Sequence, residues 1–145
     1  MTEGYRYCHS HRVRYIEIDG QNVVFNSHYL AFCMDALIGY WQNLKLTVIP
    51  DEHNVFDVSL IKSTIELKGP AYFNDLLNVY VKISRMGNTS LTVNYMIVKE
   101  NNPKPIVLVE AIYAGFNTNT KEGAPIPHDV RNEIETFERT APVLI

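Results

Sequence analysis

The sequence predicts an α+β protein in which one long helix is wrapped by a five-stranded, mainly antiparallel sheet. The first observation behind this prediction is a run over residues 27–46 that is apolar on almost every side, which is typical of a helix surrounded by protein. The second is a series of β-type segments after that run, separated by short turn-like sequences that favour antiparallel neighbours. The third is one more strand-like run before the helix. A helix this apolar needs a curved sheet around it.

Length and composition indicate one globular domain over residues 1–145, with 46% hydrophobic and 20% charged residues. The net charge is −3 and basic residues are scattered, which argues against a nucleic-acid partner or a membrane-binding patch. The apolar stretch 29–41 is too short to span a bilayer. Cys8 and Cys33 occur without a signal-peptide pattern, so we expect free thiols and a cytoplasmic protein.

The first strand is expected at Tyr7–Ile18, where polar and apolar residues alternate. Asp19 and Gly20 follow it and form a common turn pair that would end the strand. The strand should therefore deliver the Asp19 carboxylate to the edge of the sheet.

The helix that follows has a suitable N-cap in Asn26 or Ser27 and is expected to end at Leu44–Leu46. Gly39 lies inside it, where glycine costs about 1 kcal/mol relative to alanine. Close approach of the helix to the sheet at Gly39 would offset that cost.

The later part of the chain predicts four more strands and a final helix. The strands are expected at 55–68, 76–85, 90–99 and 106–117, after a loop at 50–54. Residues 90–99 alternate as a half-buried strand does, whereas 106–116 is apolar on both faces, as in a central strand. Pro127 is suited to the first turn of the last helix, on which Val130, Ile134 and Phe137 share one face.

The residues around Asp19 favour one kind of chemistry. Asp19 stands seven residues before Asn26, so a carboxylate and the free N–H groups of a helix start would lie in one segment. Such N–H groups can receive the negative charge that develops on a carbonyl oxygen. Asp19 could act as a general base on water or attack the carbonyl itself. The alternative is that Asp19-Gly20 is only a turn pair.

The segment VRYIEIDGQNVVFNSHYLAF resembles the region around the catalytic aspartate in hotdog-fold acyl-CoA thioesterases of the 4-hydroxybenzoyl-CoA type. The segments LKGPAYFNDLLNVYVKI, RMGNTSLTVNYMI and GAPIPHDV resemble later parts of that family in the same order. The resemblance implies a hotdog fold and hydrolysis of an acyl-CoA thioester to a free acid and CoA, with no cofactor. It also implies a homodimer or homotetramer with active sites at the subunit interface.

Carried over residue by residue, the resemblance implies Asp19 as the catalytic carboxylate and the backbone N–H of Asn26 as the group that polarises the thioester carbonyl. Phe25 and Tyr29 would lie beside the acyl pocket. Asn22 stands where the family usually has glycine, so a glycine-like conformation is expected there.

The resemblance places the remaining site residues on later strands. Val58 would line the site from the partner subunit. Arg85 and the turn from Gly87 to Ser90 would hold the CoA arm.

Two other functions and a metal site are alternatives to this interpretation. Acyl-thioester hydratases and dehydratases pair an aspartate with a histidine in a turn resembling Asp-x-Asn-Pro-x-His, and residues 19–26 contain neither proline nor histidine. A non-catalytic acyl-thioester binding or sensing protein remains open. His9 and His11 could suggest a metal, but no further ligand stands at suitable spacing, so no metal site is expected. His28 is expected to be a partly exposed residue in the first helical turn.

Overall fold

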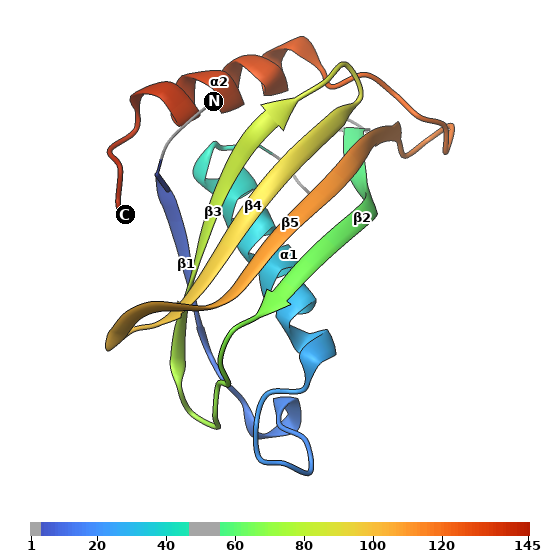
Figure 1. Cartoon of the computed structure of the whole chain (residues 1–145). Coiled ribbons are helices and arrows are strands. Elements are labelled where there is room, and N and C mark those ends of the chain that lie inside the picture. Colours follow the sequence, from blue (N-terminus) through green and yellow to red (C-terminus); the bar gives the residue numbers. More distant parts are fainter. Residues whose placement is uncertain (1–3, 47–55) are drawn as a thin grey trace.

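The computed structural model describes residues 4–46 and 56–145, which form one curved sheet with a long helix across it and a second helix at one end (Figure 1). The elements are β1 (Tyr7–Arg12), a short 3-10 helix (Tyr15–Glu17), α1 (Asn26–Asn43), β2 (Phe56–Leu67), β3 (Leu76–Met86), β4 (Ser90–Lys99), β5 (Asn102–Asn117) and α2 (His128–Thr140). In this part of the chain the five strands lie in the order β1-β3-β4-β5-β2, and all neighbours are antiparallel. The predicted α+β class is confirmed. The loop expected at 50–54 and the strand start at Val55 lie outside the described residues.

Helix α1 packs against the sheet through one face. Its buried residues recur at helical spacing and include Phe32, Leu37 and Tyr40, which meet inward-facing side chains of the sheet. Asp35 and Ile38 are exposed, so the expectation of a helix enclosed on nearly every side is wrong for this single chain.

The start of α1 corrects the predicted cap. Asn26 is the first helical residue and the N-cap is Phe25, whose side chain makes no capping hydrogen bond. The backbone fixes the helix entry instead, because Phe25 N–H donates to the Glu17 carbonyl at 3.0 Å and Val24 N–H donates to the Ala71 carbonyl at 2.9 Å. These partners are distant enough in sequence that local capping rules could not reveal them.

Gly39 brings α1 close to β1, as the sequence predicted. A Cβ atom at this position would collide with the Tyr7 hydroxyl and would come within 3.1 Å of His9 Nδ1. The glycine therefore allows a contact that a larger residue permits only if the Tyr7 side chain moves.

We expect Gly39→Ala to destabilise the protein by about 1–3 kcal/mol, because the added methyl overpacks the contact with Tyr7. Alanine's higher helix propensity would offset only part of this loss. Chemical denaturation measures the effect. Tyr7→Phe removes the clashing hydroxyl, so the double variant should recover part of the loss relative to Tyr7→Phe alone. Strictly additive effects would contradict this account.

Two strand predictions are wrong. The first strand ends at Arg12 rather than Ile18, and Tyr15 and Ile16 are 73% and 72% exposed in the 3-10 helix. The cause is tertiary, because Val13 exchanges backbone hydrogen bonds with the turn that precedes β3. The short link between β2 (Phe56–Leu67) and β3 predicted that these two strands are neighbours. In the structure they are not neighbours, and β2 pairs with β5 at the other side of the sheet.

The remaining strand predictions are confirmed in their main features. β4 has the predicted bounds, β3 extends one residue further, and β5 lies between β4 and β2 as an inner strand. β5 begins at Asn102 rather than residue 106, so the hairpin between β4 and β5 is tighter than expected.

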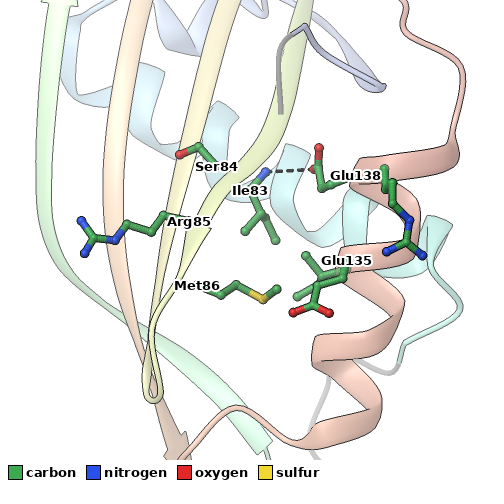
Figure 2. A pocket seen from close by; sticks show the side chains of 8 residues that line it. Ile83, Ser84, Arg85, Met86, Glu135 and Glu138 are labelled. Atoms are coloured by element: carbon green, nitrogen blue, oxygen red, sulfur yellow. Dashed lines mark hydrogen bonds between the residues drawn. The ribbon is translucent and has the colours of Figure 1, made fainter. Parts of the chain in front are cut away.

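Glu138 attaches α2 to the rest of the fold. Glu138 is 4% exposed, and one of its carboxylate oxygens accepts hydrogen bonds from the Tyr40 hydroxyl at 2.7 Å and from Ile83 N–H at 3.0 Å. Figure 2 shows the hydrogen bond from Ile83. A hollow of about 260 Å³ lies alongside, between α2 and the end of β3. Burial raises the pKa of the Glu138 carboxyl above its ordinary value of 4.5, and the two hydrogen bonds reduce this rise without cancelling it.

The stability of the Glu138→Gln variant, measured relative to the native chain, should increase as pH rises. Because the folded pKa of Glu138 is raised, the carboxyl's contribution to stability is complete below its unfolded pKa and is lost as pH rises through the folded pKa. Glutamine keeps an oxygen for Tyr40 and Ile83 and never ionises. Thermal unfolding between about pH 4 and pH 8 measures the difference. A difference in Tm that stays constant over this range would contradict the prediction.

Candidate active site

Asp19 lies in a tight turn between the 3-10 helix and α1. Its N–H donates to the Val23 carbonyl at 2.9 Å, its carbonyl accepts from Asn22 N–H at 2.9 Å, and its Oδ1 accepts from Gln21 N–H at 2.8 Å. Asn22 adopts a φ of +63°, the left-handed conformation expected where the family usually has glycine. Asp19 as a whole residue is half-buried; one carboxylate oxygen accepts a hydrogen bond within the turn, and the other makes none among the described residues.

The start of α1 presents open backbone donors directly after this turn. The N–H groups of Asn26 and Ser27 make no hydrogen bond within the described parts of the chain, whereas His28 N–H donates to the Phe25 carbonyl at 3.0 Å. Asn26 and Ser27 are exposed. A carboxylate and two unoccupied amide donors therefore belong to one short segment, as the chemistry proposed from the sequence requires.

Glu17 lies two residues before Asp19 and was not singled out as a candidate from the sequence. Its side chain is 3% exposed and contacts Arg14 and His11, with a carboxylate–His11 Nε2 distance of 2.9 Å. Burial by itself raises the pKa of the Glu17 carboxyl, but the hydrogen bonds from Arg14 and His11 outweigh it and leave the pKa below its ordinary value. The available signal was an acidic residue between two isoleucines, Ile16 and Ile18, in a run otherwise read as a strand.

Phe25 and Tyr29 lie at different depths. Phe25 is 50% exposed, and its ring meets the His28 ring edge-on at 6.3 Å. Tyr29 is buried beneath the turn, where its ring packs edge-on against Phe32 and its hydroxyl meets the Ala71 backbone. Phe25 is therefore accessible to a substrate in this chain, whereas Tyr29 supports the turn from inside. His28 is half-buried.

Arg85 and Ser90 lie at the opposite end of the sheet from Asp19. β3 starts at Leu76, which pairs with Arg12 near the Asp19 turn, and it ends beside α2 (Figure 1). Arg85 is nine residues beyond Leu76, a distance of about 30 Å along a strand. A single chain therefore does not bring Arg85 or Ser90 to Asp19. Arg85 is exposed and is among the residues that line the hollow between β3 and α2, and its side chain extends away from Glu135 and Glu138 (Figure 2).

The turn from Gly87 to Ser90 is held by a residue that the sequence reading did not single out. Arg131 on α2 donates to the Gly87 carbonyl at 2.7 Å, and Gly87 N–H donates to the Ser90 carbonyl at 2.9 Å. Val58 is half-buried on β2, an outer strand of the sheet, opposite Gly115 of β5.

The His9–His11 pair is not part of a recognisable metal centre. His11 contacts the Glu17 carboxylate, and nowhere in residues 4–46 and 56–145 do three candidate ligands come together. No helix within those ranges is long and apolar enough to cross a bilayer.

A long helix wrapped by a curved antiparallel sheet of five strands, with an aspartate-containing turn before the helix, defines a hotdog-fold protein. Residues 13–134 match the model of the Thioesterase-like superfamily, and the chain belongs to this superfamily.

Solved structures of similar fold include enzymes that act on CoA thioesters. The chain superposes on a 1,4-dihydroxy-2-naphthoyl-CoA thioesterase from Synechocystis with a TM-score of 0.78 and 19% identity, covering 88% of this chain and 94% of the other. It superposes on a hypothetical protein from Staphylococcus aureus, solved in complex with CoA, with a TM-score of 0.84 and 15% identity, covering 100% and 90%. A candidate esterase of Aquifex aeolicus (strain VF5) is 21% identical over 95 residues, 66% of this chain and 74% of that protein. At these identities the structural likeness establishes the fold.

Proposed function

We propose that the protein is an acyl-CoA thioesterase of the 4-hydroxybenzoyl-CoA type, which hydrolyses an acyl-CoA to a free acid and CoA. The observation that carries the proposal is that the half-buried Asp19 and the open amides of Asn26 and Ser27 belong to one short segment at the start of α1. Membership of the Thioesterase-like superfamily supports it, as do similar folds that act on or bind CoA compounds. The two free cysteines fit a reducing compartment, and we place the enzyme in the cytoplasm.

In the proposed reaction the thioester carbonyl oxygen accepts a hydrogen bond from Asn26 N–H, which stabilises the negative charge of the tetrahedral intermediate. Loss of one such donor typically lowers the rate by about 10²–10³-fold. Asp19 either takes a proton from the attacking water or attacks the carbonyl carbon to form an anhydride that water then cleaves. In both routes a new C–O bond replaces the C–S bond, and the CoA thiolate leaves and is protonated.

We propose that the active enzyme contains at least two copies of the chain, paired through β2. This strand is 12 residues long, lies at an edge of the sheet and exposes Ile61 and Leu67 at 64% and 49%. Long apolar edges are normally covered, and antiparallel pairing of two copies would cover both. Pairing would also place Val58 at the interface and bring Arg85 and Ser90 of a second copy towards Asp19. Two such pairs would form the homotetramer.

Release of free thiol from a panel of acyl-CoAs tests this function. Turnover that depends on Asp19 supports the thioesterase. Saturable binding without turnover would instead support a non-catalytic acyl-thioester binding protein, and conversion with no thiol release would support a hydratase or dehydratase.

A further inference from the structure

Glu17 lies near the candidate site, and its buried carboxylate is held by Arg14 and His11 although the proposed reaction does not use it. We propose that Glu17 is a positioning residue of the active site, whose buried carboxylate fixes the turn that carries both Asp19 and the Asn26 N–H. This inference rests on the proposed thioesterase function. It predicts that Glu17 controls the rate of the chemical step rather than the binding of substrate.

The Glu17 carboxylate is held on both oxygens. Oε1 accepts from Arg14 N–H at 2.7 Å and lies 2.9 Å from His11 Nε2, while Oε2 accepts from the Arg14 guanidinium at 3.0 and 3.2 Å. Since an ionised carboxylate can only accept, His11 must carry its proton on Nε2. The His11 ring is also fixed from the other side, where it lies 4.1 Å from the Phe32 ring of α1. Glu17 thus joins the end of β1, the 3-10 helix and α1.

The backbone of Glu17 transmits this position to the two reacting groups. Residues 17–25 form a small hairpin in which Phe25 N–H donates to the Glu17 carbonyl, Ile18 bridges Val24, and Asp19 N–H donates to the Val23 carbonyl. One arm of the hairpin ends at Asp19. The other passes through Phe25 into the Asn26 amide. A shift of Glu17 therefore moves the carboxylate and the oxyanion donor relative to each other.

A purely stabilising role accounts less well for this arrangement. Burying a carboxylate costs free energy unless it is paired, and apolar replacements of buried ion pairs are often equally stable. The Arg14 side chain is largely exposed, so its ion pair with Glu17 contributes little to core packing and instead fixes the orientation of the Glu17 carboxylate. The site instead needs precision, because a displacement of about 1 Å can cost roughly 10²-fold in rate.

Steady-state kinetics of Glu17→Ala and Glu17→Gln, measured well below each Tm, tests the proposal. We expect Glu17→Ala to lower kcat by about 10–10²-fold with KM changed by less than about twofold. Glu17→Gln retains the shape of the side chain and one of its two acceptor oxygens, so its kcat should lie between that of Glu17→Ala and that of the native enzyme. Glu133→Ala, an exposed carboxylate on α2, is the matched control and should leave kcat unchanged. An unchanged kcat in both Glu17 variants, with or without a lower Tm, would overturn the proposal, as would a change confined to KM.

Two measurements separate this inference from the function on which it rests. Asp19→Asn is assayed in parallel, and native-like turnover in that variant would refute the proposed role of Asp19 while leaving the Glu17 data to stand. If the native chain hydrolyses no acyl-CoA, NMR of the backbone amides tests whether Glu17 positions the start of α1. The Asn26 and Ser27 signals should shift in Glu17→Gln and not in Glu133→Ala, and their remaining in place would refute the positioning role.

Discussion

Asp19→Asn lowers kcat for acyl-CoA hydrolysis by about 10²–10⁴-fold and leaves the thermal transition nearly unchanged; this is the largest effect that we expect of any single substitution. The loss follows because asparagine can neither accept a proton from water at neutral pH nor attack a carbonyl. Stability should be retained because, among the described residues, the Asp19 side chain accepts one hydrogen bond, from Gln21 N–H, which an asparagine oxygen can also accept. The assay is release of free thiol at a saturating concentration of one acyl-CoA, with Tm measured on the same preparation.

Asp129→Asn is the matched control for this substitution, since Asp129 is an exposed carboxylate in the first turn of α2, far from the Asp19 turn. It should retain native turnover. If Asp19→Asn and Asp129→Asn are equally active, Asp19 has no part in the mechanism, and the function proposed for the chain fails with it.

Ile61→Lys should convert the proposed dimer into a monomer and reduce activity by more than about tenfold. A charged side chain on an edge strand prevents pairing with a second edge. Ile61 is 64% exposed at an irregularity of the β2–β5 ladder, so a lysine there should not disturb the core. Activity should fall because one chain alone keeps Arg85 and Ser90 about 30 Å from the Asp19 end of the sheet. Light scattering coupled to size-exclusion chromatography reports the mass.

The control for Ile61→Lys is Leu144→Lys, which places the same charge on a residue that is 55% exposed at the C-terminus. This variant should keep the native mass and activity. A monomeric native protein that is fully active, or an Ile61→Lys variant that remains paired, would contradict the shared-site model.

Local sequence signals predicted most of the fold. The long apolar run of α1, the alternation in β4 and the turn residues between β3, β4 and β5 are properties of neighbouring residues, and they led to the observed elements. Gly39 was also interpretable, because a glycine inside an apolar helix indicates close packing. The errors arose where distant residues decide the backbone. Val13 is held by the turn before β3, so β1 ends early, and β2 is paired with β5, which no pattern in β2 reveals.

For the candidate site too, the residues close together in sequence could be predicted, whereas those that depend on distant contacts could not. Asp19, Asn22 and Asn26 lie in one segment, so their grouping could be predicted from the sequence. Glu17 was missed because its role depends on a contact with His11 on another element, and alternation alone gave it no distinction. The distance between Asp19 and Arg85 could not be foreseen, since it depends on the direction of β3 in the sheet.

A crystal structure with a non-hydrolysable acyl-CoA analogue, in which a methylene replaces the sulfur, is the most direct measurement of the central claim. The account predicts the analogue's carbonyl oxygen within about 2.7–3.2 Å of the Asn26 amide nitrogen, with its carbonyl carbon facing the Asp19 carboxylate. An analogue bound with its carbonyl remote from Asp19, or turned away from the first amides of α1, would contradict it.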